Sequence, residues 1–142
     1  QVWDKGQKRP WNANLKTLCW KIGESFVKVS NHDDDIYGKL WRQRKEEEEK
    51  RNAAGALADQ ARAKLERFKI GKATDAYKAY STGILPPAHI HARAKRWAVK
   101  LFLSHWHHVA YETHYGILPP KPYVLTHLGH VDEIRVPNWP LS

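Results

Sequence analysis

The chain has 142 residues, and its 24 Lys and Arg against 15 Asp and Glu give a formal net charge of +9. This length fits one domain with its own core, and the charge favours a polyanionic partner, either a nucleic acid or an anionic membrane. A basic protein without such a partner is the plainer alternative. Seven Trp and six Tyr favour a nucleic acid, because aromatic rings stack on bases as well as filling a core.

Cys19 is the only cysteine, so the chain contains no internal disulfide. It lies in an apolar helical pattern and neither neighbour in sequence is basic, so we interpret it as a buried, unreactive thiol of a protein in the reducing cytoplasm. No apolar run approaches the roughly 18 residues of a membrane span, and no signal peptide opens the chain. Because the chain contains no Met, we expect it to begin inside a longer reading frame.

The first ten residues, QVWDKGQKRP, are polar, basic and without periodicity, and we expect residues 1–10 to form an entry strand or linker. From Trp11 onward the apolar residues follow helical spacing, with Asn12 or Asn14 placed to cap the helix. Gly23 lies inside this pattern, where it would let a neighbouring helix come close.

The acidic turn NHDDD (31–35) is predicted to cap a second helix. Consecutive carboxylates at a helix N-terminus are more simply partners of the helix dipole than metal ligands. The second helix then enters the charge run RQRKEEEEKRN (42–52), which is typical of a solvated helix with i,i+4 ion pairs. Apolar spacing returns afterwards, so either one long helix projects from the body or two helices fold back near 52–55. Helix lengths favour a projecting, charged hairpin over residues 42–60.

A short helix is predicted around 75–80, and one long helix over 85–116, where two prolines suit its entry and Gly116 its exit. Most of the circumference of the long helix is apolar, so most of its surface is expected to be buried. The remaining stripe covers about one-sixth of the circumference at 100° per residue. It consists of His89, Arg93, Arg96, Lys100, His107, Tyr111 and His114.

The last segment, residues 119–142, is rich in Pro and is predicted to be an extended tail that wraps the bundle, with a small hairpin at 128–129. The sequence therefore predicts an all-α bundle of four to five helices over residues 11–118. Its long central helix carries the basic stripe, its charged hairpin projects, and its Pro-rich tail is extended.

Nine His raise the question of a metal. His105, His108, His127 and His130 could offer four nitrogens to zinc, as in a zinc-dependent hydrolase. Zinc signatures with cysteine and a helical His-Glu-x-x-His are absent, so we expect no metal and no other cofactor. No serine lies in a nucleophile-elbow context and no Gly-rich phosphate loop is present, so the sequence identifies no catalytic residue.

Basic residues recur on several predicted elements, which favours a groove for the phosphate backbone. The candidates are His89, Arg93, Arg96, Lys100 and His107 on the long helix, Arg42, Arg44 and Lys45 in the charge run, and Lys8 and Arg9 in the entry segment. The charge-run cations would form a second contact row. Arg93, Arg96 and Lys100 share one face, and a variant with alanine at all three is expected to fold normally and to bind nucleic acid far more weakly.

Four blocks of the chain resemble the C-terminal region of DEDD-type insertion-sequence transposases: 6–30, 36–45, 85–109 and 119–130. Three motifs carry the resemblance. Asn12–Lys16 matches an Asn-x-x-Leu-Lys helix, and Tyr37, Trp41 and Lys45 match a Tyr-x-x-x-Tyr/Trp-x-x-x-Lys helix. His89, Arg93, Val99 and Lys100 match a late His-x-x-x-Arg-x-x-x-Val-Lys helix loosely in spacing.

Members of that family pair an N-terminal RuvC-like nuclease domain with a C-terminal domain that bears a helix–hairpin–helix segment and a catalytic serine. The sequence from Gln1 onward contains no RuvC-like domain with spaced acidic residues, and no serine lies within 1–11. We therefore expect that the residues that would cut DNA lie upstream or that this relative never had them. The resemblance therefore implies binding and positioning of DNA, or of a structured RNA, without cleavage by this segment. The alternative is a structural or assembly module, for instance of a phage or a filament, whose tail and charged hairpin lock neighbouring subunits into a homo-oligomer.

Overall fold

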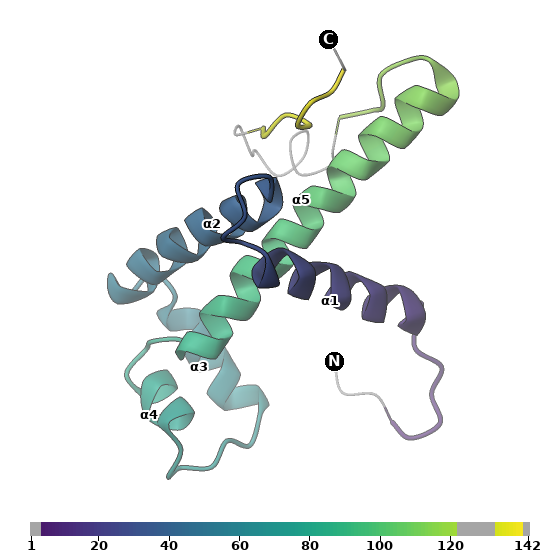
Figure 1. Cartoon of the computed structure of the whole chain (residues 1–142). Coiled ribbons are helices and arrows are strands. Elements are labelled where there is room, and N and C mark those ends of the chain that lie inside the picture. Colours follow the sequence, from purple (N-terminus) through teal and green to yellow (C-terminus); the bar gives the residue numbers. More distant parts are fainter. Residues whose placement is uncertain (1–3, 122–132, 141–142) are drawn as a thin grey trace.

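The computed structural model describes residues 4–121 and 133–140, and these form an all-α fold (Figure 1). The five helices are α1 (Ala13–Lys28), α2 (Ile36–Ala53), α3 (Ala58–Arg67), α4 (Asp75–Ser81) and α5 (Pro87–Tyr115). No strand occurs within the described ranges. The predicted fold class and the predicted number of helices are confirmed.

Side chains that precede the helices set where three of them begin. Asn12 accepts a hydrogen bond from the backbone N–H of Leu15 at 3.0 Å, and Asp35 accepts one from Gly38 at 2.9 Å. Thr74 caps α4 in the same way. Each cap satisfies a backbone donor that the first helical turn leaves without a partner.

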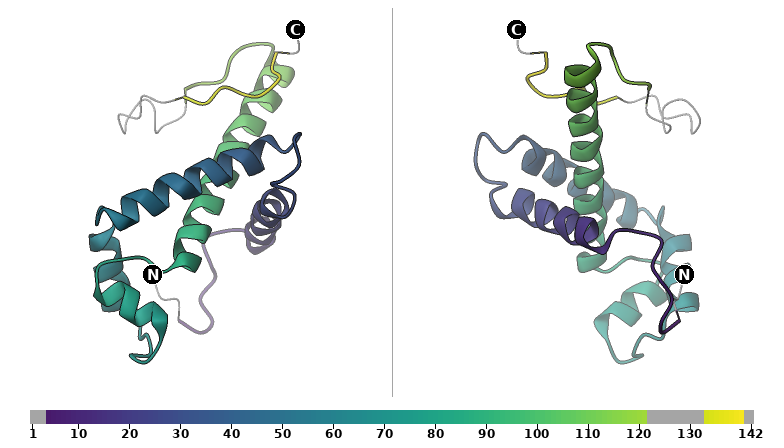
Figure 2. Two further views of the ribbon diagram at one scale, coloured as in Figure 1. Left: turned by 60° about the vertical axis from the view of Figure 1, so that its left-hand side comes forward. Right: turned by 90° about the vertical axis from the view of Figure 1, so that its right-hand side faces the viewer.

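The long helix α5 is the axis of the molecule, as predicted (Figures 1 and 2). The helices α1 and α2 pack against α5 and against each other. The helix α3 packs mainly on α4, and both lie beside the N-terminal end of α5. The C-terminal half of α5 continues beyond these crossings, and the chain leaves it at Gly116, whose φ of +69° is a left-handed conformation that glycine adopts freely.

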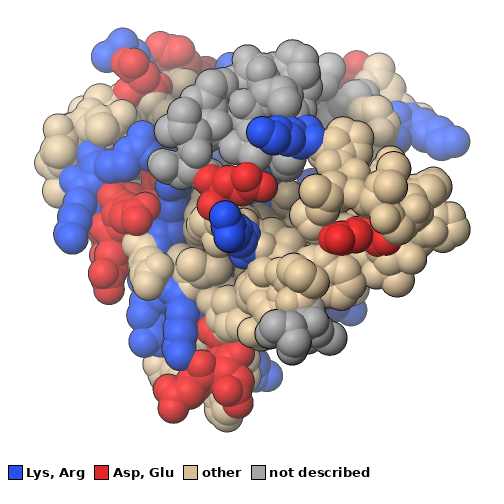
Figure 3. All heavy atoms as spheres, turned by 90° about the horizontal axis from the view of Figure 1, so that it is seen from above, with Lys and Arg blue, Asp and Glu red and all other residues tan. Residues whose placement is uncertain are grey.

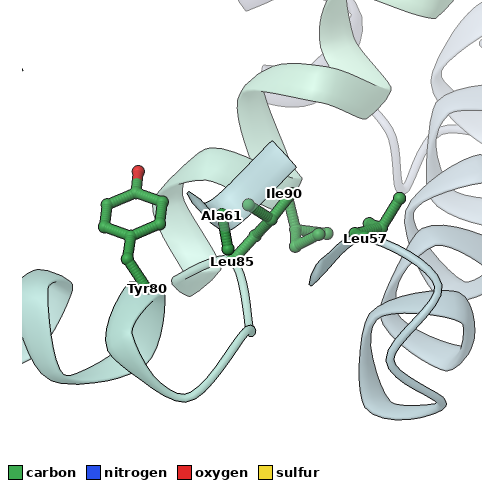
Figure 4. Packing of buried hydrophobic residues seen from close by; sticks show 5 residues of the cluster. All are labelled: Leu57, Ala61, Tyr80, Leu85 and Ile90. Carbon is green, nitrogen blue, oxygen red and sulfur yellow. The ribbon is translucent and has the colours of Figure 1, made fainter. Parts of the chain in front are cut away.

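One hydrophobic cluster joins the turn after α2 to α3, α4 and the start of α5 (Figure 4). It consists of Leu57, Ala61, Tyr80, Leu85 and Ile90, all of them buried. Because its members come from four consecutive segments, this cluster fixes the position of the N-terminal half of α5 relative to α3 and α4.

A second cluster fills the crossing of α1, α2 and α5, with Trp41, Ala94 and Ala98 at its centre. Small residues let the helix axes approach closely here. A Cβ added to the buried Gly23 of α1 would lie 2.8 Å from Cγ of Lys95 and 3.0 Å from Cγ2 of Val99. The predicted role of Gly23 in close helix contact is therefore confirmed.

The predicted break in the charged segment is present, since α2 ends at Ala53 and Gly55 turns the chain with a φ of +81°. The expectation that this segment projects as a solvated hairpin is wrong for one of its faces. The helix α2 lies along α5, where Glu48 and Asn52 are buried. The hydropathy pattern missed this face because its buried residues are polar, and they are stabilised by partners on other elements.

The described part of the tail, residues 133–140, contains neither helix nor strand and contacts the C-terminal half of α5. His105 donates from Nε2 to the carbonyl of Ile134 at 2.7 Å, and the indole N–H of Trp139 donates to Glu112 at 2.7 Å. An extended tail against the bundle agrees with the prediction. The predicted turn at 128–129 lies outside the described residues.

Candidate nucleic-acid interface

The N-terminal half of α5 presents two exposed cations, Arg96 and Lys100, one helical turn apart. Neither side chain has an ion-pair or hydrogen-bond partner within the described part of the chain. On the side of α5 that faces the other helices, Ala94, Ala98 and Val99 are buried. Packing thus fixes the helix while leaving the charges of Arg96 and Lys100 open to solvent.

The half-buried His89 shows that positive charge accumulates at this end of α5. Burial lowers the pKa of its imidazole, and the nearby charges of Lys64, Arg96 and Arg93 lower it further. Its Nδ1 lies 3.0 Å from the hydroxyl of Tyr80. The cations that lower the pKa of His89 come from both α3 and α5.

Arg93 is the stripe residue that differs most from its predicted role. Its Nε donates to Oε2 of Glu48 at 2.8 Å, and a second nitrogen donates to Gln60. The guanidinium joins α5 to α2 and α3, so its first function is structural. This corrects the expectation that Arg93, Arg96 and Lys100 are equivalent and can be removed together without affecting the fold.

Glu48 is only 1% exposed and is surrounded by three arginines. Arg44 donates to its Oε1 at 2.7 Å and Arg51 at 3.2 Å, in addition to the bond from Arg93. Burial alone would raise the pKa of Glu48, but the hydrogen bond and charge of Arg93, with the charges of Arg44 and Arg51, hold it below its ordinary value. Glu47 also lies 3.7 Å from Arg44, so two carboxylates face three guanidinium groups and the cluster has a net positive charge.

The cations of the charge run do not form the predicted second row, because consecutive residues on a helix point about 100° apart. Arg42 hydrogen-bonds Ser30 and Asn31 in the α1–α2 loop. Arg44 contacts Glu48 and lies over the ring of Trp97, while Lys45 lies over the ring of Trp41. These three cations thus contact three different parts of the fold, and of the three only Arg44 adds to the positive surface near Arg93.

The other predicted contacts lie apart from this surface. His107 is exposed two turns beyond Lys100, with its ring against that of Tyr111. Lys8 and Arg9 are exposed in the entry segment before α1. The stripe predicted along the whole of α5 thus includes exposed residues at both ends, but the cations gather at its N-terminal half.

A groove beside the start of α1 was not predicted from the sequence. It has a volume of about 340 Å³, and its lining residues are Arg9, Ala13, Lys16, Thr17 and Trp20. The spacing of the four helical members, i, i+3, i+4 and i+7, places them on one face of α1 and was visible in the sequence.

Side chains that could bind zinc are already engaged or lie outside the described residues. Both ring nitrogens of His105 have partners, the hydroxyl of Tyr37 at 2.8 Å and the carbonyl of Ile134. His108 lies 3.2 Å from Glu112. No group of three or more His, Cys, Asp or Glu suited to a metal occurs among the described residues, which do not include His127 and His130.

Seen from above in Figure 3, Lys and Arg mingle with Asp and Glu on the left of the view, while the right is mostly of other residues. Within the described ranges, no helix is both long enough and apolar enough to cross a bilayer.

Comparison of the chain with protein-family models, with curated proteins and with solved structures gives no match.

Proposed function

We propose that this chain binds the phosphate backbone of a nucleic acid, with DNA as the first candidate, through the N-terminal half of α5. The observation that carries the proposal is the pair Arg96 and Lys100, two exposed cations with no partner among residues 4–121 and 133–140, on a helix fixed by its buried face. The charges of Lys64, Arg96 and Arg93 all act on His89, so positive charge gathers at this end of α5. The resemblance of four sequence blocks to transposases supports a non-catalytic DNA-binding role within such a recombinase.

The support that α5 receives from the core matters for affinity. A cation on a fixed helix loses less conformational freedom on binding than one on an unstructured tail. The planar guanidinium of Arg96 can also donate two parallel hydrogen bonds to one phosphate. Backbone contacts of this kind set affinity and position without selecting a base sequence.

The test is the double variant R96A/K100A, which leaves Arg93 on Glu48 and therefore retains the fold. Its affinity for duplex DNA is measured by fluorescence anisotropy over a range of salt concentrations. Each lost phosphate contact makes the slope of log affinity against log salt shallower by about 0.9 on duplex DNA, so we expect a change of about 1.8. The loss is expected to be similar on unrelated sequences.

The matched control is K21A/K28A, which removes the same net charge from exposed positions on α1. Lys21 and Lys28 also have no partner within the described part of the chain. If both double variants weaken binding equally, net charge alone explains the affinity. That result, or unchanged affinity and slope in folded R96A/K100A, would contradict the assignment to α5.

A second function, the assembly module, is favoured by one specific observation. Leu15 and Leu18 of α1 and Trp106 of α5 are more than half exposed, an unusual display of apolar surface. An oligomer in sedimentation experiments that L15S/L18S dissociates, without any loss of nucleic-acid affinity, would favour assembly over phosphate binding.

A further inference from the structure

The groove at the start of α1 combines two indole rings with several cations. Trp20 lines the groove and is 59% exposed. Trp11 is 38% exposed and borders it, since Arg9 and Lys16 both line the groove and lie 6.0 Å and 5.0 Å from the centre of its ring. The ammonium group of Lys95, on α5, lies 5.4 Å from the ring of Trp20. Entry segment, α1 and α5 thus converge on the same two rings.

The charge of this groove is as informative as its rings. Two of the five lining residues are cations and none is acidic. Glu24 pairs with Lys95, the cation of α5 that lies over Trp20, and not with Arg9 or Lys16. A ligand that fits must therefore offer flat surfaces for the indoles and negative charge for Arg9 and Lys16.

We infer that this groove is a stacking site for the bases of a single-stranded nucleic acid, an inference that rests on the proposed function and names its substrate. Every base has a π-face, and stacking on tryptophan is combined with backbone neutralisation in proteins that bind single strands. The bases of a duplex are stacked on one another and cannot reach an indole without being unpaired. The groove is thus specific for unpaired nucleotides, whereas Arg96 and Lys100 bind phosphates of either form.

The position of the groove on α1 argues against an apolar protein segment as its occupant. Ala13, Lys16, Thr17 and Trp20 lie about 180° around α1 from the exposed Leu15 and Leu18 at 100° per residue. An apolar partner would gain more on the leucine face, where no lysine has to be desolvated. The two faces of α1 therefore suit different ligands: the leucine face suits an apolar partner, and the groove suits nucleotides.

The experiment compares three fluorescent probes of equal length, about 12 nucleotides, which matches the sites of single-strand-binding proteins. They are an oligothymidine strand, an abasic strand with the same phosphates, and a duplex. The variants are W20L, which keeps an apolar side chain without a π-face, and W20F, which keeps an aromatic ring. W106L is the control, because Trp106 is 62% exposed on α5, away from the groove.

We expect W20L to weaken binding of oligothymidine at least about fivefold, in line with the contribution of one stacked base. W20F should retain most of the affinity, and W106L should match the wild type. Neither the abasic strand nor the duplex should distinguish W20L from the wild type. Thermal melting verifies that each variant is folded.

If W20L loses the same affinity for oligothymidine and for the abasic strand, or loses affinity for neither, the stacking site is overturned. Those results leave the proposed function intact if R96A/K100A still loses duplex affinity. Conversely, a W20L defect confined to oligothymidine supports the stacking site even if R96A/K100A binds duplex normally, and then only the assignment to α5 fails. A wild-type chain that binds none of the three probes overturns both.

Discussion

Replacing Glu48 with glutamine isolates the buried carboxylate on which three arginines converge. The variant keeps the size of the side chain and removes its charge, so Arg44, Arg51 and Arg93 lose the buried carboxylate that they share, and only the exposed Glu47 remains, 3.7 Å from Arg44. Removing one partner of a buried ion pair costs about 3–5 kcal/mol. Because Arg44 and Arg51 retain solvent contact, we expect the lower end, about 3 kcal/mol of the free energy of unfolding.

For a chain of this size, about 3 kcal/mol corresponds to a fall in Tm of about 10 °C. Thermal and urea unfolding, followed by circular dichroism, measure the loss. The matched control is E49Q, the adjacent residue on α2, whose carboxylate is exposed and lies 3.8 Å from Lys45. This control removes the same charge from the same helix, and exposed pairs contribute about 0–1 kcal/mol.

The pH dependence of the difference gives a second, independent test. The arginines hold the pKa of Glu48 below its ordinary value of 4.5 in the folded chain. A carboxyl group with a lowered folded pKa contributes its full stabilisation above the unfolded pKa and loses it as pH falls through the folded pKa. The stability gap between wild type and E48Q should therefore be constant above about pH 5.5 and narrow as the pH falls below 4.5. Equal stability of E48Q and E49Q at pH 7 would refute the argument.

Two further predictions test the link between α2 and α5 and the assignment of the histidines. The buried Asn52 accepts a hydrogen bond from the backbone N–H of Leu85 at 2.9 Å and donates one to the Leu85 carbonyl at 2.8 Å. We therefore expect N52A to lower the free energy of unfolding in urea by about 2–3 kcal/mol. A loss below about 0.5 kcal/mol would show that water replaces the amide. A chelator should leave the Tm unchanged and metal analysis of the purified protein should find substoichiometric zinc, whereas one zinc per chain with a large chelator-induced fall in Tm would restore the histidine metal site.

The sequence by itself predicted an all-α bundle of four to five helices and where several of them begin and end. Asn12 and Asp35 were recognisable caps, and Gly116 a recognisable exit from α5. These signals depend on residues within one turn of each other, whereas the position of Gly23 in an apolar pattern predicted a close helix contact without identifying its partners, Lys95 and Val99 of α5. Local chemistry is sufficient for the caps and the exit because the interacting groups are neighbours in the chain.

Only the tertiary structure decided which cations are free. Arg93 and Arg96 are three residues apart with similar positions on the helix, yet Arg93 pairs with Glu48 of α2 and Arg96 has no partner within the described residues. The partner lies 45 residues earlier in the chain, and no local pattern marks it. Glu48 itself stands in a run of four glutamates, of which the packing of α2 on α5 buries this one.

The groove at α1 depends both on the local spacing of residues and on the tertiary structure. Its helical face follows from spacing alone, but Arg9 reaches it through the turn of the entry segment and Lys95 through the crossing with α5. Charged and aromatic residues can be counted in a sequence, but which of them lie side by side depends on how the helices cross. Composition led us to expect a nucleic-acid partner, and the packing of α1, α2 and α5 decided which cations could make the phosphate contacts that we propose, because an arginine whose charge is neutralised inside the fold cannot also neutralise a phosphate.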